Sequence, residues 1–234
     1  MKSKTRVSHK QVLWIIASAV LLPLAAWGLW HEAVDPAVGK KYDSGHERPR
    51  LAFFGSIPDF TLTERSGRTL RRSDLLGRVW IADFIFTRCA GPCPLMSGRM
   101  LRLQDGFRSE PGIRFVSFSV DPEYDRPEVL SRYAEHYQAD PDRWLFLTGD
   151  KEAIYDLSQK WFHLGVREIP AAERQDPAQW VGHSTKFVLV DRKGIIRGYY
   201  DGQEDASLDR LFEDARILLN EGDEIKNVQE GFQQ

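Results

Sequence analysis

Cys89 and Cys93 are the residues of this chain whose type and spacing point most directly to chemistry. They are the only cysteines among 234 residues, and three residues separate them. A thiolate is a nucleophile and a soft metal ligand, so a close pair can form a disulfide, exchange with another disulfide, or bind a metal ion. Two cysteines are too few for a disulfide-rich scaffold or for a zinc site of three or four thiolates.

These uses of the pair differ in what they require. A purely structural disulfide would close a very short loop and would therefore stabilise the fold little. A thiol–disulfide oxidoreductase usually has two residues between its cysteines, whereas this chain has three. A copper or zinc site needs a further ligand beyond two thiolates. The cysteines alone leave all three interpretations open.

His183 is the candidate for the further ligand. It lies just before an expected strand at residues 186–190, and residues at strand ends in an α/β sheet gather near helix N-termini, where the cysteines are expected. Two thiolates and one imidazole make a soft, trigonal set that suits Cu(I), accepts Cu(II) and is incomplete for structural zinc. The segment 167–181, which precedes His183, is expected to be a long surface loop.

The elements that must position these residues alternate between strands and helices. Residues 79–86 are almost continuously apolar, as in a central strand covered on both faces, and the cysteines follow directly. Further strands are expected at 113–120, 144–147, 186–190 and 195–200. Helices are expected along the apolar stripe from Met96 to Phe107, after a capping box at Asp125 and Glu128, after Asp150, and from Leu208 to Leu219. This order indicates an α/β sandwich with a mixed central sheet and helices on both faces, and it is also the order of the thioredoxin-like fold.

Two acidic residues lie on or next to these strands. Asp83 is the one acid inside the buried strand, so its carboxylate needs a hydrogen-bonding or charged partner. It could lie under the loop that follows this strand and carries the two cysteines, which we call the cysteine loop. Asp121 ends the strand at 113–120, directly before Pro122. It is either a turn former or a residue that orients a ligand from outside the ligand set.

The N-terminal residues indicate the compartment. Residues 1–11 form a basic tail, and residues 12–30 run for 19 residues without a charge, which spans roughly 28 Å as a helix. No lysine or arginine follows before Lys40, so the positive-inside rule places the N-terminus in the cytoplasm and the rest outside it. We therefore expect a transmembrane anchor at 12–30, with a cleaved signal peptide as the alternative, and an oxidising extracytoplasmic environment for the remaining chain.

Composition and patterning divide the rest of the chain. Residues 31–50 are expected to be a tether, 51–222 one thioredoxin-like domain with its own core, and 223–234 a polar C-terminal tail. Apolar residues make up 42% and charged residues 28%, as in globular proteins. The net charge of −2, without a basic surplus, argues against nucleic-acid binding.

Three motifs taken together resemble the SCO/SenC family. The motifs are Phe86-Thr87-x-Cys89-x3-Cys93-Pro94, Ser119-Val120-Asp121-Pro122, and Gly182-His183-Ser184 before a strand. Each motif is weak alone, but the set is specific, and the resemblance covers residues 55–222 together with the anchor. The sequence departs from the family at Ala90-Gly91-Pro92, where members often carry an acid or bulkier residues.

The resemblance implies a membrane-anchored copper metallochaperone that helps to assemble the binuclear copper centre of cytochrome c oxidase. It implies that Cys89, Cys93 and His183 bind copper, as Cu(I) and also as Cu(II), and that Asp121 tunes the site. The implied partner is the copper-bearing subunit of that oxidase, or another protein that carries copper or thiols. The implied location is the periplasmic face of a bacterial inner membrane. The alternative function is a metal-independent thiol–disulfide oxidoreductase that acts on a partner's cysteines.

Overall fold

The computed structural model describes residues 51–89, 91–174 and 181–231. The expected basic tail, anchor and tether at 1–50 lie outside the described residues. Within the described ranges, no helix combines the length and the apolar character that crossing a membrane requires.

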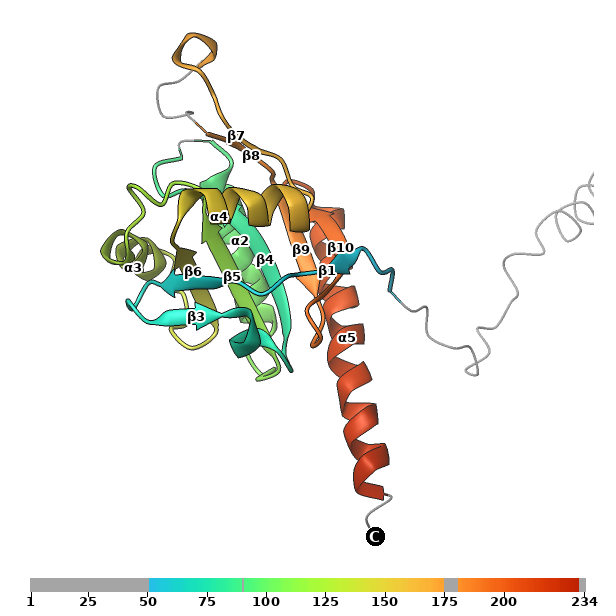
Figure 1. Cartoon of the computed structure of the whole chain (residues 1–234). Helices are drawn as coiled ribbons and strands as arrows, with labels where there is room; N and C mark the ends of the chain where they lie inside the picture. The colour runs from blue at the N-terminus through green and yellow to red at the C-terminus, as the bar shows by residue number, and fades with distance from the viewer. Residues whose placement is uncertain (1–50, 90, 175–180, 232–234) are drawn as a thin grey trace, which may run out of the picture. The chain divides into compact units, whose positions relative to one another are not determined.

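A mixed sheet of eight strands forms the centre of the fold (Figure 1). The order across the sheet is β1-β10-β9-β4-β5-β6-β2-β3. The strands are β1 (Gly55–Ser56), β2 (Thr61–Glu64), β3 (Thr69–Arg71), β4 (Val79–Ile85), β5 (Ile113–Ser119), β6 (Trp144–Thr148), β9 (Lys186–Val190) and β10 (Ile195–Asp201). Strands β4, β5 and β6 are parallel, and β9 joins β4 antiparallel. All five expected strands are confirmed, whereas the short strands β1, β2 and β3 have too little periodicity to be predicted.

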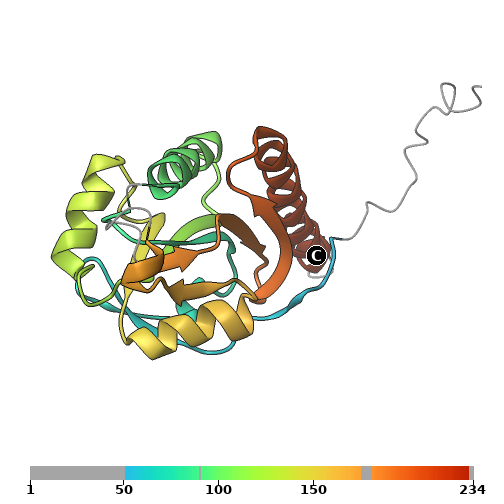
Figure 2. The ribbon, with the colours of Figure 1, turned by 90° about the horizontal axis from the view of Figure 1, so that it is seen from above.

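Helices cover both faces of this sheet. They are α2 (Cys93–Gly106), α3 (Pro127–His136), α4 (Lys151–Asp156), which continues into the π-helical turn η2 (Leu157–Trp161), and α5 (Asp205–Gly231). Figure 2 shows α2 and α5 on one side of the sheet and α4 on the other. Every residue of β4 is buried, as expected for a parallel strand that is covered twice. The thioredoxin-like α/β arrangement is therefore confirmed for the described residues, and α5 continues beyond residue 222.

The apolar stripe of α2 packs into the core, as the sequence predicts. Met96, Met100 and Leu103 are at most 1% exposed. Met96 lies so close to Gly202 that a Cβ there would come within 2.0 Å of the Met96 sulfur. The methionine thioethers on the face of Cys93 therefore pack as core residues.

The expected capping box before α3 is wrong, whereas the expected start of α4 is confirmed. Arg126 is the N-cap of α3, and its side chain makes no capping hydrogen bond. Asp125 is completely buried instead, because it accepts hydrogen bonds from groups near the cysteine loop. Asp150 does cap α4, since its carboxylate accepts a hydrogen bond of 2.8 Å from the Ala153 N–H.

The expected surface loop before His183 contains a small antiparallel sheet. Strand β7 (Val166–Glu168) pairs with β8 (Val181–His183), and the 3-10 turn η3 (Ala171–Glu173) follows β7. Residues 175–180 lie outside the described chain. His183 is the last residue of β8 and pairs with Val166, so a β-ribbon rather than a loop holds it.

Candidate metal centre

The fold brings together the three residues proposed from the sequence. The ligand atoms of Cys89, Cys93 and His183 all lie within 4.8 Å of one another, and the Cys93 Sγ lies 3.2 Å from the His183 Nε2. Three donors bonded to one ion at about 2.0–2.3 Å would stand roughly 3.5–4 Å apart. The cluster therefore has the size of a three-coordinate metal site.

The end of β4 and the start of α2 position the two sulfurs. The chain turns after β4, where the Cys89 N–H donates to the Phe86 carbonyl at 3.2 Å, and α2 begins at Cys93. Pro94 occupies the first turn of α2, where its missing N–H leaves no hydrogen bond unmade. Both cysteines are free thiols, with Cys89 9% and Cys93 1% exposed.

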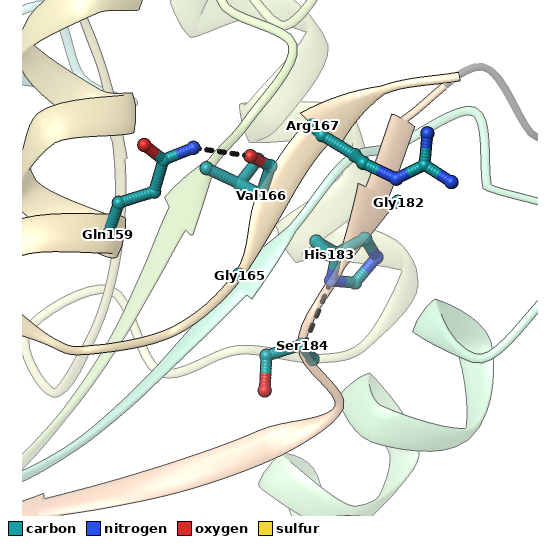
Figure 3. A pocket seen from close by; sticks show the side chains of 7 residues that line it. All are labelled: Gln159, Gly165, Val166, Arg167, Gly182, His183 and Ser184. Carbon is teal, nitrogen blue, oxygen red and sulfur yellow. Dashed lines mark hydrogen bonds between the residues drawn. The ribbon is translucent and has the colours of Figure 1, made fainter. Parts of the chain in front are cut away.

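The backbone of Ser184 orients the imidazole of His183. The His183 Nδ1 lies 3.0 Å from the Ser184 carbonyl oxygen. A dashed line joins these two residues in Figure 3. A carbonyl oxygen only accepts, so Nδ1 carries the proton and Nε2 keeps a lone pair that faces the Cys93 sulfur. The Phe86 ring packs edge-on against the imidazole, with the ring centroids 5.6 Å apart.

The pKa values of the two thiols move in opposite directions. A hydrogen bond from Cys93, together with backbone N–H groups and against the effect of burial, lowers the pKa of Cys89 to about 4. The hydrogen bond to Cys89 and burial both raise the pKa of Cys93. At neutral pH the pair is therefore one thiolate and one thiol, and the remaining proton has two acceptors, the Cys89 sulfur and the His183 Nε2.

Asp121 contacts Arg88, the residue before Cys89. Its buried carboxylate accepts hydrogen bonds from Arg88, from Nη2 at 2.6 Å and from Nε at 3.1 Å. The Arg88 guanidinium also lies over the Tyr124 ring, 4.1 Å from its centroid. The Asp121 carbonyl accepts from the Asp125 N–H at 2.8 Å, so Asp121 forms the turn after β5 and also holds the cysteine loop through Arg88. Burial raises the pKa of Asp121, and its pairing with Arg88 opposes that effect.

Asp125 is the residue near the site that sequence reasoning missed. Its carboxylate accepts from the Thr87 N–H at 3.0 Å, from the Thr87 hydroxyl at 2.5 Å and from the Ser119 hydroxyl at 2.6 Å. These bonds tie the cysteine loop to the end of β5. The available signal was the gathering of Thr87, Ser119 and Asp125 at the ends of neighbouring parallel strands, but an aspartate before a helix reads first as a cap.

Replacing Asp125 by asparagine should lower the free energy of unfolding by about 2–4 kcal/mol, because one amide oxygen cannot satisfy the buried Ser119 hydroxyl and the two partly buried donors of Thr87. Urea unfolding followed by circular dichroism measures the change. Asp59→Asn is the matched control, since Asp59 makes a surface ion pair with Arg72 and its side chain is 88% exposed. That variant should lose less than about 1 kcal/mol. Equal stability of the two variants would contradict a supporting role for Asp125.

Asp83 lies completely buried in β4 and has the partner that the sequence requires. The Ser117 hydroxyl donates to Oδ1 at 2.6 Å, and the Trp144 indole N–H donates to that hydroxyl at 3.0 Å. Oδ2 has no hydrogen-bond partner among the described residues. Burial raises the pKa of Asp83 to about 7 against the opposing effect of the hydrogen bond from Ser117. Its charge in turn raises the pKa of Cys93, so Asp83 influences the thiols electrostatically.

Comparison with known proteins places the chain in one family. The family model described as SCO1/SenC matches residues 52–218. A curated relative from Bacillus subtilis (strain 168), the SCO1 protein homolog, is 36% identical over 162 residues, which is 68% of this chain and 81% of the relative.

Solved structures agree with that match. A SCO1/SenC family lipoprotein from Bacillus anthracis is 32% identical, with a TM-score of 0.65 over 74% of this chain and 99% of the other. BsSco, described as a member of the Sco family of cytochrome c oxidase assembly proteins with a disulfide switch, is 33% identical, with a TM-score of 0.62 over 72% and 95%. ScoI from Bradyrhizobium japonicum with copper bound is 21% identical, with a TM-score of 0.56 over 70% and 99%, and that likeness concerns the fold.

Proposed function

The chain belongs to the SCO1/SenC family, and from this membership we propose that it is a copper metallochaperone that carries its ion on Cys89, Cys93 and His183. The observation that carries the proposal is the set of two sulfurs and one imidazole nitrogen within 4.8 Å. Two thiolates and one neutral imidazole prefer Cu(I) and also accept Cu(II). The copper bound to ScoI from Bradyrhizobium japonicum, which shares the fold, supports copper as the cargo.

The protonation of the cluster suits reversible loading. Cys89 is already a thiolate, and the Nε2 lone pair of His183 faces the site, so loading needs to displace only the Cys93 proton. One Cu(I) in exchange for one proton leaves the charge of the buried cluster unchanged. A three-coordinate ion keeps an open side through which a partner's ligand can enter and take the cargo by ligand exchange.

The recipient in this proposal is the copper-bearing subunit of cytochrome c oxidase, or another protein with copper-binding thiols. The membership of BsSco in a family of cytochrome c oxidase assembly proteins supports this choice. We place the domain outside the cytoplasm, at the periplasmic face of a bacterial inner membrane, anchored through residues 12–30. The positive-inside pattern of the N-terminal residues supports that location.

A thiol–disulfide oxidoreductase is the second candidate, and the opposed pKa values of the two cysteines favour it. In that reaction the Cys89 thiolate attacks a partner disulfide, and one partner sulfur leaves as a thiolate. Cys93 then loses its proton and attacks the mixed disulfide. The products are a Cys89–Cys93 disulfide and a partner with two reduced thiols.

Metal analysis and Cu(I) chelator competition on the reduced, full-length chain test the proposal. The wild type should bind close to one copper per chain, and Cys89→Ser and Cys93→Ser should each weaken binding by at least about a hundredfold, since each removes a soft donor. Ser97→Ala, a change one turn further along α2, is the control and should bind like the wild type. Turnover of a disulfide substrate by metal-free protein, combined with weak copper binding, would instead establish the oxidoreductase.

A further inference from the structure

One cavity opens beside the imidazole of His183, and a second cavity adjoins it. The first has a volume of about 460 Å³ and is lined by Gln159, Gly165, Val166, Arg167, Gly182, His183 and Ser184 (Figure 3). The second has a volume of about 540 Å³ and adds Phe54, His163, Leu164, Lys186 and Tyr199 to Gly165 and Ser184. Because the cavities share Gly165 and Ser184, they form one trough, which we call the His183 groove.

The charged groups that line the His183 groove are all basic. They are Arg167 and Lys186, the two histidines are polar lining residues, and among the described residues no aspartate or glutamate lines either cavity. Arg167 pairs loosely with Glu173 at 3.4 Å, and Lys186 pairs with Asp201 at 3.7 Å. Exposed ion pairs of this kind contribute little free energy. A carboxylate of a bound protein can therefore replace Glu173 or Asp201 as the partner of the basic side chain at small cost in free energy.

The end of the groove away from His183 carries its large apolar and aromatic side chains, beside Lys186 and His163. Phe54 is 46% exposed and contacts the Tyr199 ring edge-on, with the centroids 5.2 Å apart. Leu164 lines the same cavity and is buried. This end fits an apolar side chain, while the end at Arg167 and His183 fits an acidic one.

The middle of the groove is open because a glycine lies there. Gly165 is exposed, and a Cβ built on it would meet no atom within 4 Å. The backbone at Gly165 is not in the left-handed region, so a larger residue could be placed there without strain. The side chains of the described residues therefore do not fill the space above Gly165.

We propose that the His183 groove binds an extended, acidic segment of the protein that receives the copper. A carboxylate of that segment pairs with Arg167 beside His183, and an apolar side chain packs against Phe54 and Tyr199. The argument is charge complementarity together with continuity, because His183 lines both the groove and the metal centre. The inference rests on the proposed function, and it adds how the recipient docks.

Two groove variants with matched controls test the inference on the full-length, copper-loaded chain. Gly165→Leu fills the groove, and Arg167→Glu reverses its charge. Gly98→Leu, on the exposed face of α2, is the steric control, because a Cβ on Gly98 also meets nothing within 4 Å. Arg102→Glu is the charge control, since Arg102 makes a similarly loose ion pair with Asp209 at 3.8 Å.

The probe is the reduced, metal-free soluble copper domain of cytochrome c oxidase from the same organism. Both groove variants should keep their Cu(I) affinity but transfer copper at least about tenfold more slowly, with the effect of Arg167→Glu shrinking at high salt. Both controls should transfer copper within twofold of the wild-type rate.

Groove variants that transfer copper at the wild-type rate overturn the docking inference and leave the proposed function standing. A self-associated wild type that the groove variants dissociate also overturns it, because the occupant would then be a second copy. A wild type that binds copper but never transfers it overturns the proposed function, and the docking inference with it.

Discussion

Replacing His183 by alanine is expected to weaken Cu(I) binding by at least about a hundredfold, since loss of a residue that merely supports a ligand already costs about 10–100-fold. The imidazole is the only nitrogen donor in the cluster, and its Nε2 faces the Cys93 sulfur at 3.2 Å. Without it, two thiolates remain and the third position of the site is left to solvent. Chelator competition on the reduced chain measures the change in affinity.

The same measurement on His136→Ala supplies the control, because His136 is exposed on α3. That variant should bind copper like the wild type. The free energy of unfolding of the copper-free His183→Ala variant should fall by no more than about 1–2 kcal/mol, for one hydrogen bond and one aromatic contact. Undiminished copper binding by His183→Ala would remove the histidine from the proposed site.

The second large effect concerns the buried carboxyl group of Asp83. Burial raises its pKa from 3.8 to about 7, so the folded state holds this proton more tightly than the unfolded state does. Below about pH 4 the Asp83 carboxyl is protonated in both the folded and the unfolded state, so its ionisation does not lower the free energy of unfolding. As the pH rises towards 7 the unfolded state ionises first, and the folded protein loses stability. At 1.36 kcal/mol per pKa unit, the full loss is about 4 kcal/mol.

The free energy of unfolding of Asp83→Asn, measured relative to the wild type, should therefore increase between pH 4 and pH 8 by up to about 4 kcal/mol. Urea unfolding of the reduced, copper-free proteins at both pH values measures how the stability difference between the variant and the wild type changes with pH. Asp142→Asn, at an exposed position, controls for the loss of one carboxylate. A stability difference between Asp83→Asn and the wild type that does not vary with pH would show that Asp83 ionises in the folded protein as it does in the unfolded one.

Local sequence patterns determined the central part of this protein. A parallel strand that is buried on both faces must be apolar along its whole length, so β4 was recognisable, and the cysteines follow it directly. The helical stripe that begins near Cys93 predicted α2, because its core face repeats every three to four residues. The position of the cysteine loop, between a buried strand and the N-terminus of a helix, was therefore predictable from residues that are close together in the chain.

The tertiary structure alone decided which distant polar groups meet. Asp125 has the local pattern of a helix cap, yet donors of Thr87 and Ser119 hold its carboxylate, because a buried carboxylate is costly to leave unpaired. The β7–β8 ribbon and the hydrogen bond from His183 to the Ser184 carbonyl, which aims Nε2 at the thiols, likewise depend on packing. His183 lies 90 residues from Cys93, and no periodicity in the sequence encodes a contact across that separation. Short-range patterns specify elements, whereas the site depends on long-range contacts that form only when the elements pack.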